Sequence, residues 1–345
     1  DKYGLLIWQD FFLHSNVYPD YDQEFVKNFS IEAGQLVKRI RNRASLAILC
    51  GGNEQYEGWE EWGWKEAMDR FYGETLVTEV LPKITKELCP DIPYVINSPH
   101  GLPRAQSPVA GDMHNWGNYF NSTKDPQFVT ETCWSLETYS RPETLKKIMG
   151  LDVDLFNERG WFNQWSKITG LSRVIRFHYS SYFDVSSLRA YLRSLEIEQA
   201  LADYYALSNF RLHSSSCSGI LYWSLNKGGP LFQYGCLDYL GYPMMSYYVI
   251  KRLFNGIVIQ AYRDIDDIRV VGSNESRVNV EGTLRVRHLT VDGEELQVWE
   301  SKQSLETGKI TRMFELPNLY SQIRNRLNEV VHVEFCMRGK VVSED

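Results

Sequence analysis

The sequence predicts an α/β chain that forms an N-terminally truncated (β/α)8 TIM barrel followed by an antiparallel β-sandwich. Two observations lead to this prediction. Short apolar runs alternate with long amphipathic stretches as far as Asn255, whereas apolar and polar residues alternate singly beyond it. We therefore expect a barrel domain over residues 1–255 and a sandwich domain over residues 256–345.

Six apolar runs in the first part predict the strands of the barrel. They are too short for helices and rich in β-branched and aromatic residues, which is typical of strands buried on both faces. The runs span residues 4–10, 45–50, 93–98, 112–116, 127–132 and 219–226. Residues 21–43 and 188–213 carry apolar stripes at helical spacing and predict two long amphipathic helices.

The number of strands predicts that this chain holds only part of a barrel. A closed barrel needs eight strand–helix units, and the sequence provides six. The chain also begins inside an apolar run and without an initiator methionine. We therefore expect a missing N-terminal segment, or a second chain, to supply the first strands.

The part after Asn255 has the pattern of an antiparallel sheet. Its alternating runs span residues 257–263, 268–272, 282–291, 295–300, 309–316 and 330–337. Asp292-Gly293 separates two of these runs, which is a strong hairpin signal. This tail of about 90 residues therefore predicts a β-sandwich.

Composition excludes several classes of partner and cofactor. The chain has 37 Lys and Arg against 44 Asp and Glu, a net charge of −7, which disfavours a nucleic-acid partner. No apolar run reaches the roughly 18 residues of a membrane span. Six scattered cysteines lack CxxC or CxxH spacing, and no glycine-rich phosphate turn follows a strand, so we expect neither a metal nor a cofactor. Nothing in the sequence indicates a cellular compartment.

Two acidic residues stand out by their position. Glu54 directly follows one apolar strand, and Glu131 lies at the end of another. A carboxylate at the end of a buried strand is costly unless it is paired or used. Because the strands of a barrel end on one face, we expect both carboxylates there. Two such groups are typical of glycoside hydrolysis, in which one is the acid/base and the other the nucleophile or base.

Four further residues occupy strand ends where a barrel would have its mouth. They are Trp8, Asp10, His114 and Trp116. Aromatic faces suit the apolar faces of sugar rings, and polar groups can bond sugar hydroxyls. We expect these residues to contact a sugar, with the alternative that each only ends a strand or fills the core.

Several motifs resemble the β-mannosidase branch of glycoside hydrolase family two. They follow one another in the family's order over about residues 1–255. The motifs are Gly4-Leu5-Leu6-Ile7-Trp8-Gln9-Asp10-Phe11, Cys50-Gly51-Gly52-Asn53-Glu54, Ser98-Pro99-His100-Gly101, Gly111-Asp112-Met113-His114-Asn115-Trp116, Leu221-Tyr222-Trp223-Ser224-Leu225-Asn226 and Asp238-Tyr239-Leu240-Gly241-Tyr242-Pro243.

The resemblance implies a retaining, exo-acting glycosidase that needs no cofactor. Glu54 matches the family's acid/base and Glu131 its nucleophile. Asn53 is expected to hydrogen-bond the sugar 2-hydroxyl or the nucleophile, Trp223 to form the floor of the sugar site, and Trp134 to contact substrate. To act as an acid, Glu54 is expected to have a pKa raised by burial or by the charge of Glu131.

The resemblance also implies that residues 1–255 are the catalytic domain and residues 256–345 an immunoglobulin-like domain. The nucleophile motif departs from the family pattern, since Thr132-Cys133-Trp134 follows Glu131 where the family usually has aromatic-Gly-aromatic. The resemblance implies an oligosaccharide or glycoside substrate with terminal β-D-mannose, and the departure at the nucleophile motif leaves other sugars open. The alternatives are a β-galactosidase, a β-glucuronidase, an exo-β-glucosaminidase or a catalytically silent carbohydrate-binding fragment.

Overall fold

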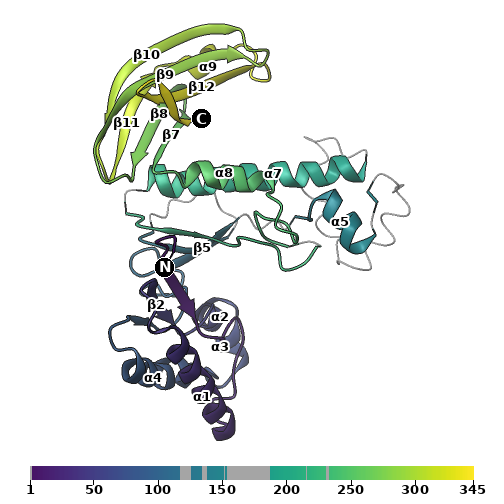
Figure 1. The fold of residues 1–345 in the computed structure, drawn as a ribbon, viewed down its shortest axis with the longest axis vertical. Helices are drawn as coiled ribbons and strands as arrows, with labels where there is room; N and C mark the ends of the chain where they lie inside the picture. The colour runs from purple at the N-terminus through teal and green to yellow at the C-terminus, as the bar shows by residue number, and fades with distance from the viewer. Residues whose placement is uncertain are drawn as a thin grey trace. The chain divides into compact units, whose positions relative to one another are not determined.

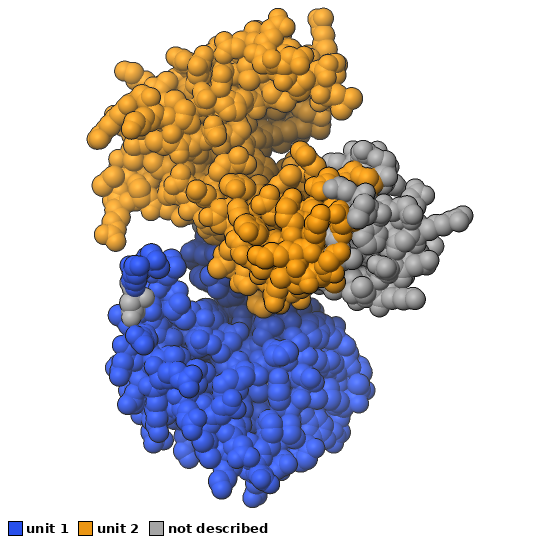
Figure 2. Space-filling model, turned by 45° about the vertical axis from the view of Figure 1, so that its right-hand side comes forward, with its two compact units in different colours: residues 1–115, 123–132, 216–221 blue, residues 116–122, 133–215, 222–345 orange. Residues whose placement is uncertain are grey.

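The computed structural model describes residues 2–116, 126–133, 138–150, 152–153, 187–214, 216–230 and 233–345. The chain forms two compact units, coloured separately in Figure 2. The first consists of residues 1–115, 123–132 and 216–221, and the second of residues 116–122, 133–215 and 222–345. The predicted domain boundary after residue 255 stays a prediction. None of the described helices combines the length and apolar character needed to cross a membrane.

A parallel sheet with helical crossovers forms the N-terminal part of the first unit (Figure 1). Its strands lie in the order β1 (Ile7–Asp10), β2 (Leu46–Cys50) and β3 (Tyr94–Val95), and both pairings are parallel. The helices between them are α1 (Gln23–Ile40), α2 (Gln55–Glu61), α3 (Trp64–Ala67), the π-helix η1 (Leu76–Val80) and α4 (Leu81–Leu88). The predicted alternation of strand and helix is therefore confirmed here.

The core of this sheet is built by the apolar stripe of α1. The stripe buries Phe29, Ala33 and Val37 against Leu49 of β2 and Leu81 of α4. The helix begins where the Asp22 carboxylate accepts hydrogen bonds from the backbone N–H groups of the first turn, as an N-cap residue should. The packing of α1 against β2 therefore fixes the positions of the strand ends.

A second sheet follows in the order β4 (Met113–Trp116), β5 (Val129–Cys133) and β6 (Ile220–Tyr222). All six predicted strands are therefore present, although several are shorter than expected. In the described part of the chain they form two three-stranded sheets, and no strand pair joins one sheet to the other. The α/β class is confirmed, whereas the truncated barrel is not.

The second unit contains helices and then a long antiparallel region. Among its described residues the helices are α5 (Pro142–Met149), α7 (Leu188–Ser208), the π-helix η2 (Asn209–His213), α8 (Met245–Leu253) and the short α9 (Leu319–Gln322). The strands are β7 (Ile257–Asp264), β8 (Asp267–Asn274), β9 (Val280–Thr290), β10 (Glu295–Leu305), β11 (Lys309–Leu316), β12 (Glu329–Met337) and β13 (Lys340–Glu344). The pattern of the sequence predicted all of these strands except β13.

These strands form a β-sandwich. One sheet has the order β10-β9-β12-β13 and the other β11-β8-β7, with antiparallel pairing throughout. Their inner faces share one core, in which Leu284, Val333 and Phe335 of the first sheet pack with Ile259 and Val270 of the second. The hairpin predicted at Asp292-Gly293 joins β9 to β10. The sandwich is therefore confirmed, and its immunoglobulin-like character stays a prediction.

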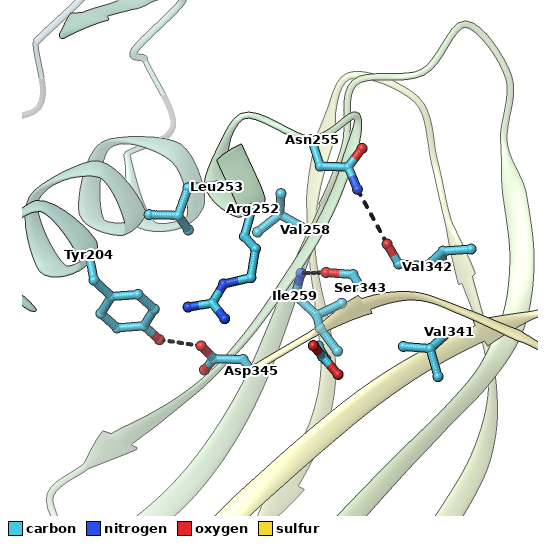
Figure 3. Close-up of a pocket in the computed structure, with 11 residues that line it drawn as sticks. Tyr204, Arg252, Leu253, Asn255, Val258, Ile259, Val341, Val342, Ser343 and Asp345 are labelled. Atoms are coloured by element: carbon cyan, nitrogen blue, oxygen red, sulfur yellow. Dashed lines mark hydrogen bonds between the residues drawn. The ribbon is translucent and has the colours of Figure 1, made fainter. Parts of the chain in front are cut away.

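A pocket of about 280 Å³ lies beside the sandwich within the second unit (Figure 3). In it, the Tyr204 hydroxyl of α7 donates to Asp345 Oδ1 at 2.7 Å, and the Ala261 backbone N–H of β7 donates to Asp345 Oδ2 at 3.0 Å. Ser343 Oγ accepts from the backbone N–H of Ile259 at 3.0 Å. These bonds connect α7, β7 and the last strand.

Gly51, between β2 and Glu54, provides a direct test of how the strand ends are placed. A Cβ atom there would come within 3.0 Å of the Ile96 carbonyl, a distance that real side chains do not adopt. We expect Gly51→Ala to lower the free energy of unfolding by about 1–3 kcal/mol, since backbone must move. Gly34→Ala is the matched control, because its Cβ would meet only Leu88 at 3.7 Å in the middle of α1.

The control should stabilise the protein by up to about 1 kcal/mol, because alanine favours a helix over glycine. Urea unfolding of the two variants beside the wild type measures both effects. Equal stability of Gly51→Ala and the wild type would contradict the close approach of β2 and the segment after β3.

Candidate active site

Glu54 is placed by the turn that joins β2 to α2. Its backbone adopts a left-handed conformation, φ 59° and ψ 12°, which is uncommon for a residue other than glycine. The backbone N–H of Glu54 donates to the Ser98 carbonyl at 2.7 Å, and that of Asn53 donates to the Leu13 carbonyl at 2.9 Å. Segments that follow β1 and β3 therefore hold this strained turn in place, and the turn directs the Glu54 side chain.

Glu131 and His114 come from two neighbouring strands. Glu131 lies in the middle of β5 and His114 in β4, and both residues are buried. The side chain of His114 is 1% exposed, that of Glu131 is 10% exposed and that of Glu54 is 16% exposed. All three residues belong to the first compact unit.

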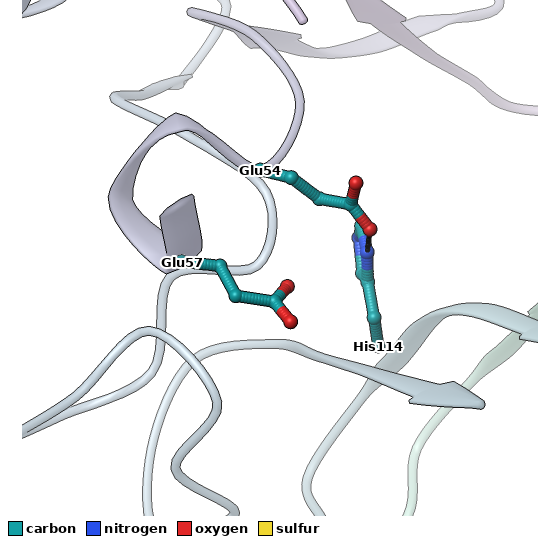
Figure 4. Close-up of side chains that lie close together, drawn as sticks. All are labelled: Glu54, Glu57 and His114. Carbon is teal, nitrogen blue, oxygen red and sulfur yellow. Dashed lines mark hydrogen bonds and ion pairs between the residues drawn. The ribbon is translucent and has the colours of Figure 1, made fainter. Parts of the chain in front are cut away.

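The carboxylates of Glu54 and Glu131 both contact the same nitrogen atom of His114. His114 Nδ1 lies 2.9 Å from Glu54 Oε1 and 3.0 Å from Glu131 Oε2. Figure 4 shows the Glu54 carboxylate against the imidazole ring. Because both oxygens contact the same atom, they are at most about 6 Å apart, close to the ~5–5.5 Å separation of retaining glycosidases.

The other ring nitrogen of His114 is held by a buried polar network. Its Nε2 lies 3.1 Å from Ser98 Oγ, and Ser98 Oγ donates to Asp112 Oδ2 at 2.7 Å. Thr130 Oγ1 donates to the same Asp112 oxygen at 2.6 Å, and the His100 backbone N–H donates to Asp112 Oδ1 at 2.9 Å. These bonds fix the plane of the imidazole and thereby aim Nδ1 between the two carboxylates.

The shared contact determines the charge of His114. Burial on its own lowers the pKa of this histidine, but the hydrogen bonds and charges of Glu131 and Glu54 outweigh burial and raise the pKa of His114 to about 9. The ring is therefore an imidazolium at neutral pH. Its Nδ1–H faces the carboxylates, and its Nε2–H faces Ser98.

The pKa of Glu54 is lowered, and the prediction that it is raised is wrong. Burial acts to raise the pKa of this carboxyl, but the hydrogen bond and charge of His114 and the hydrogen bonds of Ser15 and Asn53 together lower it. Ser15 Oγ donates to Glu54 Oε2 at 2.9 Å. The sequence placed two carboxylates together but did not show the cation between them.

Asp10 and Trp8, both predicted to contact sugar, lie in the same unit as the carboxylates. Trp8 Nε1 donates to Asp10 Oδ1 at 2.9 Å, and the Trp8 ring stacks on Phe128 with centroids 6.1 Å apart. Burial raises the pKa of Asp10, hydrogen bonds from Cys50 and Trp8 oppose this, and the charges of His114 and Glu131 also act on it. Asp10 is thus electrostatically coupled to the site.

Three further tryptophans, Trp116, Trp134 and Trp223, are also predicted to contact a sugar. Trp116 ends β4 and packs edge-on against Tyr234, with ring centroids 5.2 Å apart, and Trp223 follows β6 and is 49% exposed. Both are assigned to the second compact unit. Trp134 lies outside the described residues. Their contacts with a sugar stay predictions, as do the catalytic roles of Glu54 and Glu131.

Glu54, Glu57 and His114 have the spacing of a metal site, since their ligand atoms lie within 4.8 Å of one another (Figure 4). The nitrogen that would bind the ion is His114 Nδ1, which carries the proton shared with the carboxylates. Glu57 Oε2 already accepts a hydrogen bond from Gln106 Nε2 at 2.9 Å. In the described residues the cluster is therefore held together by hydrogen bonds and by the charge of His114.

The sequence did not single out three residues of this network. Ser98 and Asp112 belong to two of the family-like motifs, but the sequence did not indicate that they hold the His114 ring. Ser15 lies in the segment after β1, and no pattern connects it with Glu54, 39 residues further along the chain. The Ser15 hydroxyl lies next to the Glu54 carboxylate only in the folded chain.

Comparison with known proteins shows relatives over nearly the whole chain. A β-mannosidase B of Aspergillus niger is 23% identical over 349 residues, which cover 95% of this chain and 40% of that protein. The crystal structure of a β-D-mannosidase from Dictyoglomus thermophilum matches 99% of this chain and 42% of that chain, with a TM-score of 0.84 and 24% identity. An exo-chitosanase of Amycolatopsis orientalis matches 95% of this chain and 39% of that chain, with a TM-score of 0.61 and 17% identity. No family model matches the chain.

The fold is therefore that of the corresponding part of glycoside hydrolases that include these enzymes. Both the sequence relatives and the structural match with the higher TM-score are β-mannosidases, so the resemblance to the β-mannosidase branch of glycoside hydrolase family two is confirmed. The chain spans about 40% of the length of these relatives.

The raised pKa of His114 predicts how stability depends on pH. The pKa in the folded chain, about 9, lies above the ordinary value of 6.5, so the imidazolium stabilises the fold fully below pH 6.5. This contribution, at most about 3 kcal/mol, is lost as the pH rises to 9 and above. Urea unfolding of the wild type and His114→Gln at pH 6 and pH 9.5 measures the loss.

His114→Gln should not lose this stability between pH 6 and pH 9.5. The control variant His14→Gln changes an exposed histidine of the same unit and should lose it as the wild type does. Parallel pH dependence of the wild type and His114→Gln would show that His114 does not bind the shared proton.

Proposed function

We propose that this chain carries the catalytic carboxylates of a retaining exo-β-glycosidase, a β-mannosidase that releases terminal non-reducing β-D-mannose. The observation that supports the proposal most is the contact of Glu54 and Glu131 with one nitrogen of His114. Carboxylate oxygens at most about 6 Å apart suit a nucleophile and an acid/base that act on one sugar, since the carboxyl groups of retaining enzymes lie ~5–5.5 Å apart.

In the proposed reaction, a Glu131 oxygen attacks the anomeric carbon while Glu54 gives its proton to the leaving oxygen. The glycosidic bond breaks, and a covalent glycosyl-enzyme forms. Glu54, now a carboxylate, takes a proton from water, and the resulting hydroxide displaces Glu131 from the sugar. The anomeric configuration of the substrate is retained because it is inverted twice.

The structure suggests where the proton of the first step comes from. In the resting arrangement the proton is on His114, and Glu54 is ionised, because its pKa is lowered. Transfer across the 2.9 Å contact from His114 Nδ1 to Glu54 Oε1 gives a neutral imidazole and a protonated Glu54. That is the protonation state in which the first step begins.

We further propose that the first part of the chain is a segment of a (β/α)8 barrel, with the catalytic domain in residues 1–255 and an immunoglobulin-like domain in residues 256–345. The strand order β1-β2-β3 and β4-β5-β6 follows the chain, as in a barrel. In the described part of the chain β1 is a sheet edge, and Leu5, Leu6 and Ile7 nearby are 66%, 75% and 43% exposed. Further strands, from an N-terminal segment or a second chain, would pair with this edge.

A second candidate is another exo-β-glycosidase with the same pair of carboxylates. The observation in its favour is the structural match with the exo-chitosanase, which covers nearly the whole chain. Nitrophenyl glycosides of β-mannose, β-glucosamine, β-galactose and β-glucuronic acid separate these activities. Sugar binding without turnover on any of them would instead favour a carbohydrate-binding fragment.

Azide rescue tests the roles of the two glutamates in a protein that carries this chain with its further barrel strands. Glu131→Ala should abolish turnover of nitrophenyl β-mannoside, and Glu54→Ala should slow it by about 10²–10⁴-fold. Azide replaces whichever carboxylate is absent. The glycosyl azide should retain the configuration of the substrate for Glu54→Ala and invert it for Glu131→Ala, as NMR of the product shows.

Glu57→Ala is the control, because Glu57 is a carboxylate of the same cluster without a role in the proposed steps. Its product should be mannose and not an azide. Turnover near the wild-type rate in Glu131→Ala would refute the assignment of the nucleophile.

The open edge of β1 leads to a separate prediction about the chain alone. With that edge unpaired, water reaches the sheet and the spacing of the carboxylates is less well fixed. We expect residues 1–345 alone to have less than about 1% of the turnover of an N-terminally extended protein, a loss on the scale of a misplaced catalytic group. Kinetics of both proteins on nitrophenyl β-mannoside test this, and equal turnover would show that no further strands are needed.

A further inference from the structure

The two oxygens of the Glu54 carboxylate have different partners. Oε1 lies 2.9 Å from His114 Nδ1, whereas Oε2 accepts a hydrogen bond of 2.9 Å from the hydroxyl of Ser15. Figure 4 shows one oxygen against the imidazole ring and the other directed away from it. Rotation of the carboxylate about its last side-chain bond would break both contacts, so the two partners together fix its orientation.

The backbone around Ser15 is bonded to the turn that carries Glu54. The Ser15 N–H donates to the Asn53 carbonyl at 2.7 Å, and the Asn53 N–H donates to the Leu13 carbonyl at 2.9 Å. Residues 13–15 and Asn53 therefore form a short parallel ladder. Because this ladder fixes the Ser15 backbone against the turn, the hydroxyl is held within reach of the carboxylate.

The conformation of Ser15 is unusual as well. Its φ is 35°, in the left-handed region that residues other than glycine rarely adopt, and Glu54, at the other end of the hydrogen bond, has a φ of 59°. Strained residues of this kind cluster at functional sites, where the surrounding structure holds them. Among the described residues the Ser15 hydroxyl bonds only Glu54.

A hydrogen-bond donor at Oε2 has two effects on an acid. It favours the ionised form, and the Ser15 bond is one of the contacts that lower the pKa of Glu54. It also leaves Oε1 as the oxygen that takes up the proton, and Oε1 is the atom that faces His114. The atom that receives the proton is then the atom that delivers it, with no rotation of the carboxyl group in between.

We infer that Ser15 is a positioning residue for the acid step of the proposed reaction, on which the inference rests, because its hydroxyl holds Glu54 with Oε1 toward the leaving oxygen. In that step the proton moves from Oε1 to the leaving oxygen while the glycosidic bond breaks, and the electron pair of the bond stays on that oxygen. Ser15 acts only through Glu54. Its contribution therefore depends on how much the leaving oxygen needs a proton.

The alternative is that Ser15 only stabilises the turn after β2. Loss of the hydroxyl would then disturb the turn whatever the substrate is, and all substrates would be slowed alike. A positioning role predicts unequal losses, since a phenolate with two nitro groups departs without a proton and plain phenolate does not.

Steady-state kinetics of Ser15→Ala test the inference in the protein that carries this chain with its further barrel strands. On phenyl β-D-mannoside kcat/KM should fall about tenfold, on the scale of one hydrogen bond to a charged group. On 2,4-dinitrophenyl β-D-mannoside kcat/KM should stay within about twofold of the wild type, because the acid is not needed. Azide should yield no mannosyl azide, since the Glu54 carboxylate is still present.

Ser15→Gly separates the hydroxyl from the backbone. Glycine adopts a positive φ at no steric cost, so this variant should fold even if Ser15→Ala is less stable. It should show the same loss on phenyl mannoside and the same near-normal kcat/KM on dinitrophenyl mannoside. Wild-type kinetics of Ser15→Gly on both substrates would show that the hydroxyl has no role, and would overturn the inference.

Ser30→Ala is the matched control. Ser30 belongs to the same unit, and its hydroxyl donates to the Val26 carbonyl within α1 at 2.6 Å. This variant should match the wild type on both mannosides. Equal losses on the two mannosides in Ser15→Ala, or no loss on either, overturn the inference.

The proposed function can fail separately. If azide rescues neither Glu54→Ala nor Glu131→Ala, the proposed function is refuted, and the inference is refuted with it. If rescue succeeds and Ser15→Ala slows both mannosides equally, the proposed function stands and only the role of Ser15 is refuted.

Discussion

The contact of two carboxylates with one imidazolium nitrogen is the constraint on which the candidate site depends. Glu54 and Glu131 are both largely buried and lie so close that two negative charges without a cation would repel strongly. The proton on His114 removes this repulsion and gives each carboxylate a hydrogen-bond partner. Everything that fixes the ring, above all Ser98 and Asp112, therefore also fixes the distance between the carboxylates.

The contact of both carboxylates with His114 explains the unusual backbone conformation at Glu54. Glu54 must reach His114 from the end of β2, and a left-handed residue directly after Gly51-Gly52-Asn53 turns its side chain in that direction. The two glycines allow this because side chains there would collide with the carbonyls of Ile96 and Leu13. Glu131 needs no such device, because β5 lies beside β4, which carries His114, and the Glu131 carboxylate contacts that ring directly.

Much of the fold and part of the site could be predicted from local patterns. Hydrophobic periodicity predicted α1, α7 and the strands of the sandwich except β13. Predicted strand ends drew attention to Glu54, Glu131 and His114, although Glu131 and His114 lie inside β5 and β4. The direction in which the pKa of Glu54 shifts could not be predicted. It depends on which group lies within 3 Å of the carboxylate, and tertiary structure determines that. Ser15 was missed for the same reason. β13 was missed because its run of five residues is too short to show a period.

The environments of the two carboxylates differ in a way that suits two different roles. Glu131 lies within a paired strand, so its position varies little, as a nucleophile that forms a bond requires. Glu54 lies in a turn, is more exposed, and bonds both the proton donor His114 and a hydroxyl of the segment after β1. A group that must first give and then take a proton needs such partners on both sides.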